Sequence, residues 1–206
     1  MILETVIVGP MQVNCYILAC AESGEAVIID PGDQARKIKT VLDRHKLRPA
    51  IVINTHGHYD HIGGDDEFGV CVYAHKQDLV MLENADKNLS ASFSLPFQVK
   101  SEIKVLEDKE IIKLECLELE VLHLPGHTPG GIGLLMKKPQ ADIVFTGDTL
   151  FYQGVGRCDL PEGSQHLLNK SIKEKLFVLP GQTKVYPGHG PATTIGREKS
   201  NNPFID

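Results

Sequence analysis

The segment Thr55–Gly64, THGHYDHIGG, places three histidines and one aspartate within six consecutive positions, directly behind an apolar stretch. In an extended segment His56 and His58 project to the same side, because side chains alternate along a strand. Asp60 and His61 reach a nearby second point only if the chain bends after them. Imidazole nitrogens and carboxylate oxygens are ligands for zinc, iron and manganese. The segment therefore predicts a metal site at the end of a strand.

Three further candidate ligands follow predicted strands in the same way. Each lies in a glycine-flanked turn: His127 in LPGHTPGG, Asp148 in FTGDT and His189 in YPGHGP. In layered α/β folds the loops at the carboxyl ends of strands gather along one edge, where sites tend to be built. Seven candidate ligands at one edge predict a two-metal site.

Short apolar runs alternate along the chain with a few amphipathic segments, a pattern typical of a layered α/β fold. We expect strands at residues 2–8, 13–19, 26–29, 50–54, 71–74, 102–106, 110–114, 117–124, 132–136, 142–145 and 184–186, and helices at 33–46, 76–81 and 164–179. Asp33 is expected to open the first helix and Ser164 to cap the last. The three runs between residues 102 and 124 suggest a meander, and Glu22–Glu25 a polar turn.

Composition limits the kinds of partner. A chain of 206 residues with 42% hydrophobic residues can bury a substantial core, and we expect one domain over residues 1–206. The net charge of -6 and a pI of about 5.8 disfavour nucleic acid and acidic membranes as partners. The N-terminal segment has no basic region and is interrupted by Gly9 and Pro10, which argues against a signal peptide or membrane span.

The cysteines indicate the compartment. There are five, an odd number without paired spacing, and most lie in strand-like runs. We expect buried free thiols in a reducing cytoplasm rather than a disulfide framework. The oligomeric state is not fixed by the sequence.

The motifs THGHYDH, PGHTPG, GDTLF and YPGHGP together resemble the metallo-β-lactamase superfamily, and within it the glyoxalase II group of hydroxyacylglutathione hydrolases. The resemblance covers nearly the whole chain. It implies a four-layer αββα metallo-β-lactamase sandwich with the metal site at one edge of the sheets. The implied ligands are, for the first metal, His56, His58 and His127; for the second, Asp60, His61 and His189; and, bridging both, Asp148. Lactamases proper resemble one another in having a cysteine near the place of Asp148, which weakens an antibiotic-hydrolysing interpretation.

The resemblance also implies a reaction. Two divalent metal ions, with zinc expected and iron or manganese also compatible, lower the pKa of a bridging water. The resulting hydroxide would cleave a small-molecule thioester such as S-D-lactoylglutathione. Asp60, His61 and Asp148 would carry the catalytic roles, with Asp60 orienting the nucleophile. A thiolate leaving group, with a pKa of about 8.5, departs without a dedicated proton donor.

The substrate-binding features match the family only in part. Glyoxalase II proteins typically continue into a C-terminal helical domain that contacts glutathione, and we expect this chain to lack it. Arg157 matches the family's basic residue nine positions after the bridging aspartate and is the expected substrate-binding residue. The alternative is that it pairs with Asp159 or Glu162. Asp159 and Pro191 stand where the family has aromatic residues. Without that helical domain, the expected chain most resembles the compact glyoxalase II-like hydrolases of bacteria and archaea.

Two other functions fit the same motifs. Persulfide dioxygenases of this superfamily are similar around GR-DF and bind a single iron through two histidines and an aspartate. Metal count and oxygen consumption therefore discriminate a dioxygenase from a thioester hydrolase. A metal-binding or thiol-sensing module is a non-enzymatic alternative, which a thioesterase assay tests.

The remaining features have structural interpretations as well as functional ones. The loop Asn84–Pro96 is either one wall of the substrate cleft or a disordered surface loop. Structural roles are expected for four other histidines: His45, His75, His123 and His166.

Overall fold

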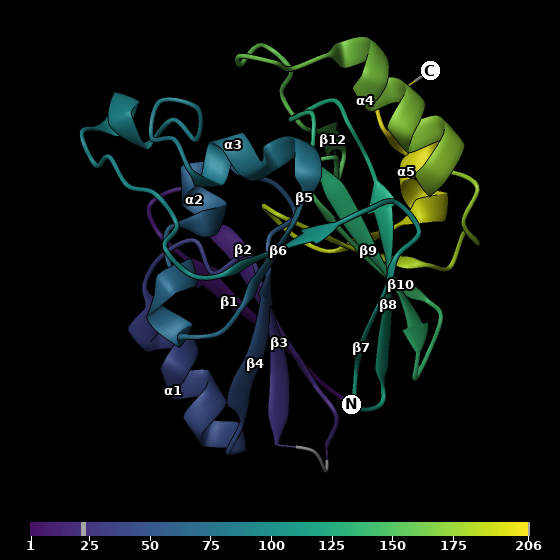
Figure 1. Cartoon of the computed structure of the whole chain (residues 1–206). Coiled ribbons are helices and arrows are strands. Elements are labelled where there is room, and N and C mark those ends of the chain that lie inside the picture. Colours follow the sequence, from purple (N-terminus) through teal and green to yellow (C-terminus); the bar gives the residue numbers. More distant parts are fainter. Residues whose placement is uncertain (22–23, 206) are drawn as a thin grey trace.

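The structure is a computed structural model that describes residues 1–21 and 24–205, so the expected turn at Glu22–Glu25 lies partly outside the described residues. Two six-stranded sheets face each other, with helix α1 outside the first and helices α4 and α5 outside the second (Figure 1). This is the four-layer αββα sandwich that the motifs imply, and that prediction is confirmed.

The first sheet is built mainly from the N-terminal half of the chain. Its strands, in spatial order, are β1 (Ile2–Val8), β2 (Val13–Ala19), β3 (Glu25–Ile29), β4 (Arg48–Ile53), β5 (Val72–His75) and β6 (Ile103–Leu106). The order of the second sheet is β14 (Thr193–Thr194), β13 (Lys184–Pro187), β10 (Ile143–Gly147), β9 (Ile132–Lys138), β8 (Leu117–His123) and β7 (Ile111–Leu114). A small separate ribbon pairs β11 (Leu150–Phe151) with β12 (Gly154–Val155).

The helices are few and short. They are α1 (Ala35–His45), α2 (Tyr59–Ile62), α3 (Leu79–Leu82), α4 (Gln165–Ser171) and α5 (Ile195–Asn201), with 3-10 turns at Asp65–Phe68, Lys76–Asp78 and Ser90–Phe93 and a π-helical turn at Ile172–Leu176. Ser164 caps α4 as predicted, its hydroxyl accepting from the backbone N–H of Leu167. No helix in the described ranges is long and apolar enough to cross a bilayer.

Alternation along the strands divides the apolar residues into the layers of the sandwich. In β2, which is buried on both faces, Cys15 and Ile17 pack with Ile38 of α1, whereas Tyr16 and Leu18 pack against Phe145 of the opposite sheet. A third cluster joins the outer face of the second sheet to α4 and α5. Because successive strand residues point to opposite faces, a strand with apolar residues at every position is typical of the centre of such a sandwich.

Two sequence expectations were wrong in detail, and one helix was not foreseen. The strands between residues 102 and 124 form no meander: β6 pairs in parallel with β5 in the first sheet, whereas β7 and β8 pair in the second. Alternation identifies a strand but not its partner. The first helix begins at Ala35, because Gln34 adopts the left-handed conformation (φ 49°), and Asp33 lies outside the helix. Helix α5 follows the final histidine motif and was not foreseen.

The cysteine expectation also needs correction. Cys20, just after β2, and Cys116, in the turn between β7 and β8, form a disulfide, whereas Cys15, Cys71 and Cys158 are free. The two paired residues are 96 positions apart, and only the packing of one sheet on the other brings them together. Spacing along the chain carries no signal for such a pair.

Candidate metal centre

The THGHYDH motif changes from extended chain to helix at its centre. Strand β4 ends at Ile53, and α2 begins immediately after His58, which has extended backbone (φ -71°, ψ 145°). The helical turn directs Asp60 and His61 to a different point from His56 and His58. This is the bend that the sequence required.

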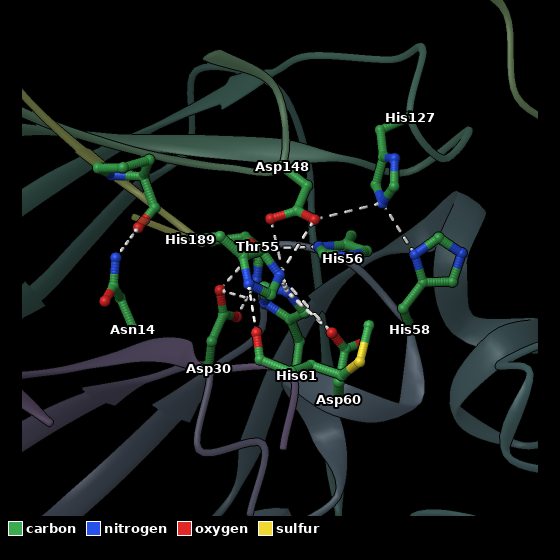
Figure 2. A network of polar contacts seen from close by, with 12 residues as sticks. Asn14, Asp30, Thr55, His56, His58, Asp60, His61, His127, Asp148 and His189 are labelled. Carbon is green, nitrogen blue, oxygen red and sulfur yellow. Dashed lines mark hydrogen bonds and ion pairs between the residues drawn. The ribbon is translucent and has the colours of Figure 1, made fainter. Parts of the chain in front are cut away.

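The other candidate ligands arrive on turns that follow strands of the second sheet. His127 follows β8, Asp148 follows β10 and His189 follows β13. Figure 2 shows the Asp148 carboxylate in the middle of the cluster, facing His127 on one side and His189 on the other. The facing sheets thus contribute to one site from the same edge.

Distances divide the cluster into adjacent groups. Ligand atoms lie within 4.8 Å of one another in each of three triads: His56, His58 and His127; His56, His61 and Asp148; and Asp60, His61 and His189. The Asp148 carboxylate lies between the first and last groups, with Oδ2 3.7 Å from His127 Nε2 and 3.4 Å from His189 Nε2. All seven residues predicted as ligands therefore converge.

The polar atoms of the cluster lack ordinary partners, as a cation site would require. Among the described residues, His56 Nε2 and Asp148 Oδ1 are buried and without a hydrogen-bond partner. Ring nitrogens face each other at 2.9 Å between His58 and His127 and at 3.3 Å between His61 and His189. Buried polar atoms are normally satisfied, and nitrogen and oxygen donors converging in this way suit zinc, iron or manganese. The residues present fit two divalent ions.

Protonation differs between the two halves of the cluster. Burial, together with the neighbouring imidazoles, lowers the pKa of His56 far below its ordinary value and that of His58 to about 3. Burial also opposes protonation of His61, but Asp148, Asp30 and Asp60 outweigh it and raise its pKa to about 10. In the metal-free protein His56 and His58 are neutral and can donate lone pairs, whereas His61 holds a proton that a metal would displace.

Backbone and carboxylate acceptors orient the histidines. His127 Nδ1 lies 2.8 Å from the carbonyl oxygen of Arg157, and His189 Nδ1 lies 3.0 Å from that of Met11. His61 Nδ1 lies 3.0 Å from Asp30 Oδ2. Such contacts leave Nε2 of each ring facing the cluster, and partners of this kind fix the orientation of metal-binding histidines.

Two aspartates that the sequence analysis missed hold the loops of the site. Asp30 accepts from the backbone N–H and hydroxyl of Thr55, both at 2.7 Å. Asp78 accepts from Gly57 N at 3.0 Å, from the Thr128 hydroxyl at 2.7 Å and from Gly130 N at 2.5 Å. Asp78 thus joins the His56–His58 loop to the His127 turn. Asp30 directly follows an apolar strand, as Asp148 does, and that position could have identified it.

Gly188 is required by close packing beside the cluster. A Cβ atom at this position would lie 2.2 Å from Asp148 Oδ1 and 2.8 Å from His61 Cε1. Side-chain atoms essentially never approach so closely, so the glycine of the YPGHGP motif makes room for the Asp148 carboxylate.

A cleft of about 400 Å³ opens onto Asp148, His58, His127 and His189. Leu89 and Phe93 line it, so the loop Asn84–Pro96 forms one wall, as one of the two interpretations predicted. Arg157 also lines it, but its side chain forms a bidentate pair with Asp159, with Nε–Oδ1 and Nη2–Oδ2 both 2.7 Å. Whether Arg157 contacts a substrate stays a prediction.

Three of the four remaining histidines have structural contacts, and His166, on α4, is exposed. His75 and His123 stack with ring centroids 4.1 Å apart, and His123 Nε2 lies 2.9 Å from the carbonyl oxygen of Pro129, in the turn that carries His127. His45 is half-buried and lies 2.7 Å from Glu4.

Comparison with known proteins agrees with the geometry. The model of the metallo-beta-lactamase superfamily matches residues 8–189. Hydroxyacylglutathione hydrolase GloC of Haemophilus influenzae is 36% identical over 99% of this chain and 98% of its own length. The probable metallo-hydrolase YqgX of Bacillus subtilis is 37% identical over 97% of this chain and 95% of its own.

Solved structures give the same result. BLEG-1 B3 metallo-beta-lactamase matches with a TM-score of 0.91 and 37% identity, covering 99% of each chain. TTHA1623 in a di-iron-bound form matches with a TM-score of 0.84 and 36% identity over 98% of this chain and all of that one. ETHE1 from Myxococcus xanthus matches with a TM-score of 0.81 and 27% identity over 98% of this chain and 84% of that one. With its fold, its motifs and its near full-length relatives in agreement, this chain belongs to the metallo-β-lactamase superfamily and has the fold of a metallo-hydrolase.

Proposed function

We propose that this protein is a dinuclear metal-dependent thioester hydrolase of the hydroxyacylglutathione hydrolase type, acting on a small molecule. The observation that carries the proposal is the pair of ligand triads on either side of Asp148, His56–His58–His127 and Asp60–His61–His189. A relative named for this activity, at 36% identity over nearly the whole chain, supports it.

Seven converging ligands favour two ions, and their nitrogen and oxygen donors favour zinc or iron. Similarity to a di-iron-bound structure supports iron as strongly as the donor set supports zinc. When bound, two such ions supply a water of lowered pKa as nucleophile and polarise the substrate carbonyl.

The chain's own residues would position the reacting groups. Asp60 lies at the second triad, with Oδ2 3.6 Å from His189 Nε2, and in this proposal it would accept a hydrogen bond from the attacking water. A substrate that covers the apolar side chains around the cleft would exclude bulk water, which would strengthen electrostatic interactions there. A thiolate leaves without a proton donor at neutral pH, so the proposed roles include no general acid. Water is the proposed nucleophile, so they include no serine or cysteine nucleophile either.

Two other activities have specific support. Similarity to ETHE1 favours the mononuclear iron persulfide dioxygenase alternative, but the complete second triad argues against a single ion. BLEG-1 carries the name of a B3 metallo-beta-lactamase, which favours lactam hydrolysis. The aspartate at position 148, where the family resemblance gives lactamases a cysteine, argues against it.

The test combines elemental analysis with activity on one preparation. We expect about two metal ions per chain and hydrolysis of S-D-lactoylglutathione or another thioester. Asp148→Asn should lose the bound metal and the hydrolytic activity together. One iron per chain, oxygen uptake on glutathione persulfide and no thioesterase activity would overturn the proposal in favour of the dioxygenase. Turnover of nitrocefin without thioester hydrolysis would favour the lactamase.

A further inference from the structure

The cleft beside the candidate metal centre is apolar apart from the candidate ligands, Tyr59 and Arg157. Its apolar lining comes from Met11, Leu89, Phe93, Phe151, Val155 and Leu160. At about 400 Å³ it has the size of a small-molecule site. A substrate whose carbonyl lies at Asp148 would therefore contact several of these apolar side chains.

Part of this apolar surface is exposed to solvent. Met11 is 49% exposed and Phe93 is 54% exposed, and the Phe93 ring packs against Tyr59 with centroids 4.7 Å apart. Exposed apolar side chains grouped around a hollow mark binding surfaces, because a ligand that covers them removes apolar area from water.

The apolar surface continues past Met11 and Tyr59. A second hollow of about 260 Å³ shares these two residues with the cleft, and Leu95 and Phe97 extend its apolar lining. The charged residues among its described lining are both acidic, Asp33 and Asp60. An anionic substrate group would find no cationic partner in this hollow.

The cations beside the cleft are already engaged. Arg157 is the one cationic side chain in the described lining of the cleft, and both arms of its bidentate pair go to Asp159. Lys87 pairs with Glu162, an ion pair that joins the Leu89 segment to the Leu160 segment. Glutathione carries two carboxylates, and carboxylate recognition depends on charged or multiple hydrogen-bond donors.

We propose that the preferred substrate is a thioester with an uncharged, apolar acyl group and a thiol without carboxylates, and that Asp159 disfavours glutathione thioesters by occupying Arg157. This inference rests on the thioesterase activity proposed above. In the reaction, water adds its oxygen to the acyl carbon as the C–S bond breaks. The water gives one proton to solvent, the released carboxylic acid keeps the other, and the departing thiolate takes up a proton from solvent.

The first experiment measures kcat/KM of the metal-loaded protein on four matched thioesters. Phenylacetyl and D-lactoyl groups are each joined to glutathione and to the neutral thiol N-acetylcysteamine, and each rate is normalised to alkaline hydrolysis of the same ester. We expect the phenylacetyl ester of N-acetylcysteamine to exceed S-D-lactoylglutathione by at least about 10-fold, the size of burying one aromatic ring. A higher value for S-D-lactoylglutathione overturns this inference but supports the proposed function. Hydrolysis of none of the four overturns both.

The second experiment uses variants at exposed positions. In Asp159→Asn the freed Arg157 should lower KM for S-D-lactoylglutathione by about 2- to 5-fold relative to KM for the neutral ester, the range of an exposed ion pair. Adding Arg157→Gln to Asp159→Asn should return KM for S-D-lactoylglutathione to its original value. Asp43→Asn, on the exposed face of α1, is the matched charge control.

Phe93→Ala should lower kcat/KM for the phenylacetyl ester several-fold more than for the lactoyl ester. Equal effects of Phe93→Ala on both esters, with no change in Asp159→Asn, contradict the proposal.

Discussion

Asp30 and His61 form a buried pair in which Oδ2 of the aspartate lies 3.0 Å from Nδ1 of the histidine. Their side chains are 2% and 0% exposed, and the same carboxylate accepts two hydrogen bonds from Thr55. One group therefore orients a ligand of the second triad and fixes the start of the THGHYDH motif. Asp30 directly follows β3, an element that contributes no candidate ligand of its own.

Asp30→Asn should weaken metal binding at the second triad. The amide keeps the shape of the side chain but removes the charge that favours the His61 orientation, and losses of about 10- to 100-fold in metal affinity are typical for such partners. Chelator competition followed by elemental analysis measures the change. The control is Asp43→Asn, and equal metal retention by both variants would contradict the role of Asp30.

Asp78→Asn should act on the first triad instead. Its carboxylate accepts three hydrogen bonds that hold the Gly57 loop against the turn containing Thr128 and Gly130. We expect loss of the first metal before the second, together with a fall of about 1–3 kcal/mol in the free energy of unfolding from unsatisfied buried donors. Cobalt titration followed by absorbance separates the sites. The same order of metal loss in Asp30→Asn and Asp78→Asn would show that at least one of the two aspartates does not act on the triad assigned to it.

Metal binding should release protons between pH 6 and 8. In the metal-free protein the pKa of His61 is about 10, raised by Asp148, Asp30 and Asp60 against the effect of burial. The imidazole is therefore protonated throughout this range, and a metal must displace its proton. Apparent affinity for the second metal should rise about 10-fold per pH unit for one proton released.

Calorimetry in buffers with different ionisation enthalpies counts those protons directly. A pH-independent second affinity with no buffer dependence would mean that His61 is neutral before the metal binds.

Gly188→Ala should disrupt the centre while Gly154→Ala should not. The added methyl would meet Asp148 Oδ1 at 2.2 Å, whereas at Gly154 the nearest atoms are 3.7 Å away, an ordinary contact. We expect Gly188→Ala to keep its fold by circular dichroism and to lose at least about nine-tenths of its metal and thioesterase activity. Full metal content in Gly188→Ala would show that Asp148 can move without penalty.

The disulfide predicts a thiol count. Denatured without reductant, the protein should expose three reactive thiols, from Cys15, Cys71 and Cys158, and with reductant all five. Cys20→Ser should lower the free energy of unfolding of the oxidised protein by about 2–4 kcal/mol, whereas Cys71→Ser, which removes a free thiol, serves as the control. Five thiols without reductant would show that the bond does not form.

The same count bears on location, which we propose to be the cytoplasm. Disulfides rarely persist there, because cellular thiols reduce them. Five thiols trapped in rapidly quenched cells and three after purification would agree with a cytoplasmic protein that oxidises on isolation. Three thiols in the quenched cells would contradict that location.

The sequence by itself determined most strands and the positions of all seven candidate ligands. Strands such as β1 and β2 were predictable because local alternation and composition decide which residues can lie between two apolar layers. The ligands were predictable because each motif combines a strand end, a glycine-rich turn and a metal-binding side chain. These are local properties, carried by a few consecutive residues.

Tertiary structure decided everything that depends on partners distant along the chain. The assignment of β6 to the first sheet and β7 to the second, the pairing of Cys20 with Cys116, and the contacts of Asp30 and Asp78 all join segments separated by many residues. The pairing of Arg157 with Asp159 was open between two interpretations, because both a substrate anion and a neighbouring carboxylate satisfy a guanidinium. Side-chain chemistry specifies what a residue can bind, whereas packing of the two sheets specifies which partner is within reach.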